Sequence, residues 1–178
     1  MKNIIYNEIK TVENEISESV TRRKYNQLTL MLIEKKLTIT AMESCTSGQI
    51  ASLITDTEGS SAVIKGSFVT YSNEAKIKMG VSKKIIEEFG VYSSQTCCEM
   101  ARVCRNHYDA DIGIGVTGTF VNPDPDNSDS TPGEVFFAID TSKNTRCFHC
   151  TVPAQKTRFL YKMYIADLIV DVLLKDIT

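Results

Sequence analysis

The chain has 178 residues, of which 42% are hydrophobic and 24% charged, and this composition is typical of one globular domain rather than a disordered segment. Its net charge of −2 and pI near 5.7 supply no field that attracts phosphate backbones or anionic lipid, so nucleic acid and membrane partners are disfavoured. With neither a long apolar run nor a signal-peptide core, the chain is expected to be cytoplasmic, and its six cysteines are expected to stay reduced.

The N-terminal segment shows a helical spacing of apolar residues. Ile5, Ile9, Val12 and Ile16 recur at intervals of four, three and four, which predicts an amphipathic helix over residues 2–20. We therefore divide the chain into an N-terminal helical extension, residues 1–22, and a domain, residues 23–178. We expect the apolar stripe of the extension to form a subunit contact, and the protein to be a homo-oligomer.

The rest of the chain alternates strands and helices. This alternation predicts a single three-layer α/β/α domain with a mixed sheet. Local signals support individual elements: Ser82 and Gly90 are a good N-cap and C-cap for the helix between them. After three basic residues at 22–24, we expect a helix that ends near residue 37. Further helices are expected at 48–54, 83–89, 94–108 and 154–174, and strands at 38–41, 63–70, 111–116, 134–140 and 145–152.

Two segments carry groups suited to nucleophilic catalysis. Ser44 lies between the expected strand at 38–41 and a helix, and Lys76 follows the expected strand at 63–70. A serine hydroxyl needs a base, and a lysine can serve if burial lowers its pKa. Of the two histidines, His107 lies near a helix end and His149 inside a strand, so Lys76 is the better candidate. From spacing alone, Ser44 as a helix cap and Lys76 as a solvated residue stay open.

Five short motifs follow one another along the chain. They span residues 40–48, 59–61, 90–93 and 115–118, and the most specific is Thr-Tyr-Ser-Asn-Glu-Ala-Lys at 70–76. Together they resemble the CinA C-terminal domain family, and the resemblance covers about residues 24–175. Members of this competence- and damage-inducible family include nicotinamide-nucleotide amidases, which hydrolyse the carboxamide of nicotinamide mononucleotide to the acid and ammonia.

The resemblance implies a hydrolase with a Ser-Lys dyad and no cofactor or metal. Ser44 matches the nucleophile, Lys76 its base, and Tyr71 a further hydroxyl of the site. The implied substrate is a small amide, with nicotinamide mononucleotide the first candidate. Backbone N–H groups near Cys45–Ser47 are placed to hold an oxyanion. The residues expected to contact the substrate are Cys45, Thr46, Ser47, Gly48, Asn73, Thr117, Gly118 and Arg158.

The chain departs from the family pattern in several places. Ser47 stands where a glycine is usual, Met42 replaces an alanine, and Ala154 an arginine. A glycine-rich loop is replaced by residues 118–127. We expect Asp124 and Asp126 in this stretch, and Asp129 just after it, to oppose a phosphate. A non-catalytic ligand-binding or oligomerising module that retains the fold is therefore the rival hypothesis.

Two possible metal sites are less well supported by the sequence than the Ser-Lys pair. Cys147, His149 and Cys150 have metal-like spacing, but in a strand Cys147 and His149 face one way and Cys150 the other. The acidic loop at 117–132 offers oxygen ligands, but Asp, Asn, Ser and Pro are also the residues of ordinary solvated turns.

Overall fold

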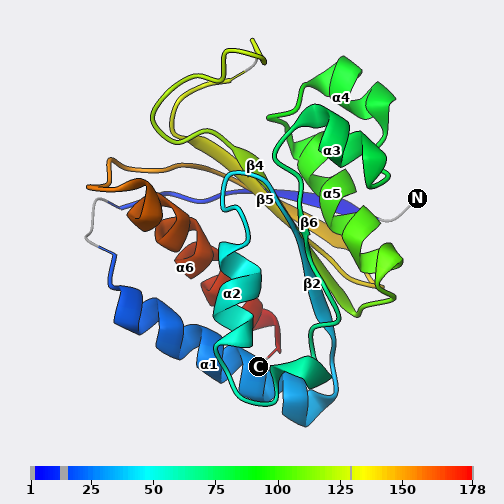
Figure 1. Cartoon of the computed structure of the whole chain (residues 1–178), viewed down its shortest axis with the longest axis vertical. Coiled ribbons are helices and arrows are strands. Elements are labelled where there is room, and N and C mark those ends of the chain that lie inside the picture. The colour runs from blue at the N-terminus through cyan, green and yellow to red at the C-terminus, as the bar shows by residue number, and fades with distance from the viewer. Residues whose placement is uncertain (1–2, 13–15, 129, 178) are drawn as a thin grey trace.

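The computed structural model describes residues 3–12, 16–128 and 130–177, and shows one mixed six-stranded sheet covered by helices on both faces (Figure 1). The strands are β1 (Ile4–Glu8), β2 (Ile39–Glu43), β3 (Phe68–Val69), β4 (Ile112–Gly118), β5 (Glu134–Asp140) and β6 (Thr145–Thr151). The helices are α1 (Glu18–Lys35), α2 (Gln49–Thr55), α3 (Asn73–Lys78), α4 (Lys83–Phe89), α5 (Ser94–His107) and α6 (Arg158–Ile177), with a 3₁₀ turn at Ser60–Ala62. The expected α/β class and mixed sheet are confirmed.

The sheet has the strand order β1-β6-β5-β4-β2-β3. The β5–β6 hairpin and the β4–β5 pair are antiparallel, whereas β4, β2 and β3 run parallel. In parallel strands the carboxyl ends meet at one edge, where α/β proteins place their ligand sites. Consequently the segments after β2, β3 and β4 converge.

Helices α1, α2 and α6 cover one face of the sheet, and α3, α4 and α5 lie on the other (Figure 1). The main apolar core lies under α6, where Phe137 of β5 and Ile169 are fully buried. On the opposite face α5 approaches β4 closely: a Cβ added at Gly115 would lie 2.3 Å from the carbonyl oxygen of Cys97. Glycine is therefore required there by packing.

The helix expected over residues 2–20 is wrong. Residues Ile4–Glu8 form edge strand β1, parallel to β6, with Ile4 opposite Thr145. Successive β-branched and aromatic residues favour a strand, and the open edge of β6 supplies its backbone partners; the N–H of Ile9, for example, donates to the His149 carbonyl oxygen at 2.9 Å. The part of the expected helix at residues 2 and 13–15 lies outside the described residues. The expected self-association stays a prediction.

The boundary expected between residues 22 and 23 falls inside α1, which begins at Glu18. Lys24, one of the basic residues at this point, pairs with two acids: its Nζ lies 2.9 Å from a carboxylate oxygen of Asp167 and 2.8 Å from one of Asp171, both on α6. These pairs join α1 to α6, so this segment is part of the domain's packing.

Two other expected elements are shorter. The strand at 63–70 is reduced to Phe68–Val69, because the chain first forms the 3₁₀ turn and makes only an isolated bridge at Ile64. The last helix begins at Arg158 rather than 154, where the Thr157 hydroxyl accepts from the N–H of Leu160 at 3.2 Å.

Candidate active site

Ser44 lies at the sharp turn between β2 and α2. Its N–H donates to the Val116 carbonyl oxygen at 3.0 Å, so the end of the sheet fixes its backbone. The turn then needs two left-handed residues, Ser47 at φ 54° and Gly48 at φ 88°, before α2 begins. Ser44 is 6% exposed, and its side chain borders a cavity.

Glu43, the last residue of β2, holds this turn together. Its fully buried carboxylate accepts hydrogen bonds from the N–H groups of Ile50 at 3.1 Å and Ala51 at 3.0 Å. Burial raises the pKa of the Glu43 carboxyl, while these N–H donors oppose that rise. The carboxylate thereby ties the segment carrying Ser44 to the first turn of α2. Our sequence reasoning missed this role, although a carboxylate ending a buried apolar strand is itself a signal.

Replacing Glu43 with Ala is expected to lower the free energy of unfolding by about 2–3 kcal/mol, because one buried and one partly buried N–H group lose their acceptor. Glu43→Gln keeps an acceptor oxygen and should lose less. Urea unfolding measures both, with the exposed Glu34→Ala as the matched control. A Glu43→Ala protein as stable as that control would contradict this role.

Lys76 reaches Ser44 from the opposite segment. Ser72 caps α3 by accepting from the N–H of Ala75 at 3.1 Å, and the helix directs Lys76 inward. Lys76 is 1% exposed; its Nζ lies 3.1 Å from Ser44 Oγ and donates to the Thr70 carbonyl oxygen at 2.9 Å. The two residues, 32 positions apart, thus form a buried hydrogen-bonded pair, as the Ser-Lys hypothesis requires.

Burial changes the proton affinity of the groups around Ser44. Burial lowers the pKa of Lys76 from 10.5 to about 8, although the Coulombic effects of Cys45, Asp124 and Glu74 oppose the shift. Burial also raises the pKa of the neighbouring Cys45 thiol to about 12, so this thiol stays protonated and is a weak nucleophile. Among the contacts described here, the Lys76 amine lies within hydrogen-bond distance of the Ser44 hydroxyl.

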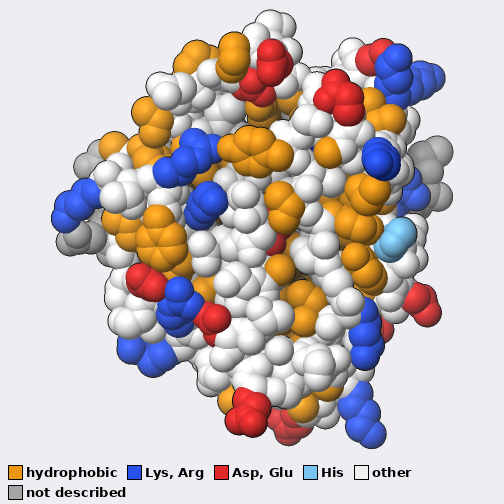
Figure 2. All heavy atoms as spheres, viewed as in Figure 1, with side chains coloured by type: hydrophobic (Ala, Val, Ile, Leu, Met, Phe, Trp, Pro, Cys, Tyr) orange, Lys and Arg blue, Asp and Glu red, His pale blue; other side chains and the backbone are white. Residues whose placement is uncertain are grey.

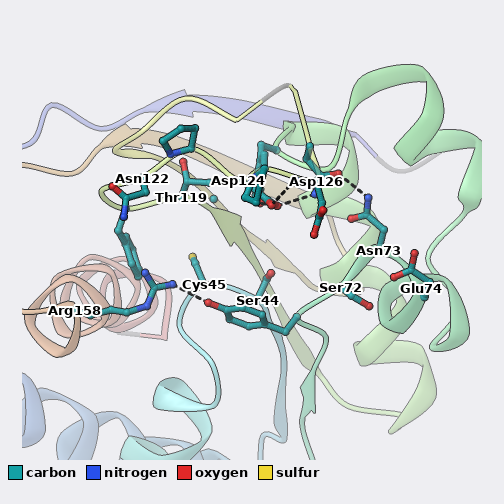
Figure 3. A pocket seen from close by; sticks show the side chains of 17 residues that line it. Ser44, Cys45, Ser72, Asn73, Glu74, Thr119, Asn122, Asp124, Asp126 and Arg158 are labelled. Carbon is teal, nitrogen blue, oxygen red and sulfur yellow. Dashed lines mark hydrogen bonds between the residues drawn. The ribbon is translucent and has the colours of Figure 1, made fainter.

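Tyr71 and Arg158 form the opposite wall. Arg158 Nη2 donates to the Tyr71 hydroxyl at 2.7 Å, and the guanidinium lies over the Phe120 ring, 5.3 Å from its centroid (Figure 3). Phe120 in turn stacks on Tyr161, which steadies this wall. The Tyr71 hydroxyl therefore accepts a hydrogen bond from Arg158, whereas Ser44 Oγ accepts one from the Lys76 amine. Phe120 was not anticipated from the sequence.

These side chains surround a cavity of about 800 Å³ between the ends of the strands and the loop after β4 (Figure 3). Six of the expected site residues line it: Ser44, Cys45, Tyr71, Asn73, Gly118 and Arg158. Lys76 lies behind Ser44. The other expected contacts, Thr46, Ser47, Gly48 and Thr117, lie outside the described lining. Thr117 is buried and its hydroxyl donates to the Val91 carbonyl oxygen at 3.0 Å.

The expected oxyanion donors are only partly available. The N–H of Ser47 donates to the Ser44 carbonyl oxygen at 3.0 Å and so is used within the turn. Cys45 is the residue of the turn that borders the cavity beside Ser44.

The loop after β4 closes the cavity, and its acidic residues differ in their exposure and hydrogen bonding. Asp124 accepts hydrogen bonds from the Tyr92 hydroxyl at 2.5 Å and from Asn127 Nδ2 at 2.7 Å, and these donors lower the pKa of its carboxyl. Asp126 is exposed at the cavity rim. Asp129 lies outside the described residues. Tyr92 and Asn127 were missed as site residues, although Tyr92 belongs to the motif at 90–93.

The described residues contain no group of three or more His, Cys, Asp or Glu side chains placed to hold a metal ion. Cys147 packs with Cys97 and Cys98 on one face of β6, while Cys150 belongs to the main core on the other, which confirms the opposed faces expected there.

None of the helices in the described ranges is long and apolar enough to span a membrane. On the face in Figure 2, acidic and basic side chains are scattered rather than gathered by sign.

Comparison with known proteins places the chain in one family. A family model of the CinA C-terminal domain matches residues 22–169. A CinA-like protein of Flavobacterium psychrophilum is 43% identical over 114 residues, 64% of this chain and 27% of that protein. A protein of Acetivibrio thermocellus, named as competence-damage inducible, is 33% identical over 162 residues, 86% of this chain and 39% of its own. The chain thus spans well under half of these curated relatives.

Solved structures share the fold. A CinA superfamily protein of Klebsiella pneumoniae superposes with a TM-score of 0.80 at 20% identity, covering 88% of this chain and 97% of that one. The competence/damage inducible protein CihA of Agrobacterium tumefaciens superposes with a TM-score of 0.78 at 25% identity, covering 94% and 98%.

Proposed function

Since this chain belongs to the CinA C-terminal domain family, we propose that it is an amidohydrolase that cleaves the carboxamide of a small molecule through Ser44 and Lys76. One observation carries the proposal: Lys76 Nζ lies 3.1 Å from Ser44 Oγ, with both groups nearly buried beside a cavity of ligand size.

In the proposed reaction, the neutral Lys76 amine takes the Ser44 proton as Oγ attacks the amide carbon. The Lys76 ammonium then gives this proton to the departing nitrogen, so ammonia leaves and an acyl ester stays on Ser44. Water, deprotonated by the same amine, hydrolyses the ester, and the proton returns to Ser44 Oγ. The Thr70 carbonyl oxygen, 2.9 Å from Nζ, keeps the amine oriented.

The developing oxyanion needs a donor at the Ser44 end of the cavity. The backbone N–H of Cys45 is the candidate, because Cys45 follows Ser44 directly and borders the cavity. On the opposite wall the Arg158 guanidinium supplies positive charge for an anionic substrate group. Its bond to Tyr71 holds it in place, so we propose an orienting role for Tyr71.

The first test is ammonia release from nicotinamide mononucleotide, nicotinamide riboside and free nicotinamide. Ammonia from at least one amide supports the proposal. No ammonia from any of them, combined with measurable nucleotide binding, would favour the rival ligand-binding module.

The loop carries a separate prediction about the substrate. Asp126 is exposed at the cavity rim, where its charge opposes a phosphate, so we expect weak preference for the nucleotide over its riboside. Asp126→Asn should raise the ratio of the two kcat/KM values about two- to fivefold. The distant, exposed Asp109→Asn is the control. Strong nucleotide preference that Asp126→Asn leaves unchanged would refute the argument.

A further inference from the structure

Four side chains form a continuous hydrogen-bonded chain across the cavity. The Tyr92 hydroxyl donates to Asp124 Oδ2, which also accepts from Asn127 Nδ2, and Asn127 Oδ1 accepts from Asn73 Nδ2 at 2.7 Å. All four residues line the cavity. This series of hydrogen bonds runs from Tyr92, just before α5, through Asp124 and Asn127 of the loop at 119–132, to Asn73, the first residue of α3.

The tip of this loop is a preformed turn. In Asp124-Pro125-Asp126-Asn127, the N–H of Asn127 donates to the Asp124 carbonyl oxygen at 3.3 Å, and the N–H of Asp126 donates to Asp124 Oδ1 at 3.0 Å. An acidic first residue and a proline second are the residues that such a turn favours. The Asp124 carboxylate thus accepts from two groups of the loop itself as well as from Tyr92, and Asn127 lies at the end of the turn.

The base of the loop is held separately. The Thr119 hydroxyl donates to the Thr131 carbonyl oxygen at 2.7 Å, and the N–H of Gly133 donates to the Thr119 carbonyl oxygen at 3.1 Å. The loop therefore has a fixed base and a structured tip. Among the described residues, the amide pair of Asn127 and Asn73 joins that tip to α3.

Helix α3 also carries Lys76, three residues after Asn73. We propose that Asn127 is a positioning residue whose side chain latches the 119–132 loop to the start of α3. Closing the loop over the cavity then also steadies the helix that presents Lys76 to Ser44. A single, partly exposed amide hydrogen bond is weak enough to break and re-form in each turnover. The catalytic part of this role rests on the amidohydrolase function proposed above.

Hydrogen exchange tests the latch without requiring activity. Asn73→Ala removes this bond alone, whereas Asn127→Ala also removes the donor to Asp124. Both variants should speed amide exchange in the loop and in α3 about fivefold, and the double variant should add little to the effect of Asn127→Ala. Ser128→Ala, exposed in the same loop and outside the cavity lining, is the matched control.

Kinetics tests the positioning role on whichever amide yields ammonia. Both variants should raise KM and lower kcat, with non-additive effects in the double variant. Unchanged exchange in Asn73→Ala, or additive kinetic effects, would overturn the latch. Faster exchange with unchanged KM and kcat would overturn the positioning role. If the wild-type protein cleaves no amide, the proposed function and this role both fail, while exchange still decides whether the latch exists.

Discussion

Replacing Ser44 with Ala is expected to reduce ammonia release by about 10⁴-fold or more, since no acyl ester can form without the nucleophilic oxygen. The fold should survive. Ser44 does not cap α2, whose N-cap is Gly48, and the change removes one described side-chain hydrogen bond, to Lys76. The free energy of unfolding should fall by only about 1 kcal/mol.

Ammonia release and urea unfolding, measured on the same preparation, separate these two effects. Ser52→Ala, exposed on the neighbouring helix α2, is the control, and it should retain activity and stability. Turnover near the wild-type rate in the Ser44→Ala protein would exclude the acyl-enzyme mechanism.

Lys76 is expected to give the reaction its alkaline dependence. The neutral amine is the active base, and its pKa is about 8, so kcat/KM should rise with pH through this value and level off above it. Lys76→Arg keeps a positive charge that is not lost near neutrality and should lose activity by at least about 10²-fold. Lys78→Met, exposed on the same helix, should keep the wild-type pH profile.

The same pKa shift predicts a change in stability with pH. The unfolded lysine titrates near 10.5 and the folded one near 8, so between these values the unfolded state binds more protons. The contribution of Lys76 to the free energy of unfolding therefore rises with pH across this window. Relative to Lys76→Met, the wild-type protein should gain stability from about pH 8 to 10.5. A constant difference between the two proteins would show that the amine is not buried as a weak base.

Local sequence signals identified much of the framework. Ser82 with Gly90 bracketed α4, the helix expected at 94–108 forms as α5, and the strand Glu134–Asp140 forms where its pattern indicated. These elements depend on caps and periodicity within a few residues, and such information is contained in the local sequence. The motifs at 40–48 and 70–76 likewise indicated Ser44 and Lys76 as a pair.

The tertiary structure decided what depends on distant partners. The apolar residues from Ile5 to Ile16 have a helical spacing, yet residues 4–8 form a strand that pairs with β6. They do so because the open edge of the sheet supplies hydrogen-bond partners for their backbone groups. The lowered pKa of Lys76 also comes from the packing around it, chiefly through burial. The pairing of Tyr71 with Arg158 joins residues 87 positions apart.

In the acidic loop, too, the sequence indicated one part of the structure and tertiary packing decided the other. Its composition correctly indicated a turn, and it suggested acidic side chains facing a substrate. The structure instead directs the Asp124 carboxylate to Tyr92, Asn127 and the N–H of Asp126, since hydrogen-bond donors from the loop and from the start of α5 surround it. The sequence alone determined which groups are available for chemistry. Their partners, burial and charge state were decided by the fold, because these depend on segments that only tertiary packing brings together.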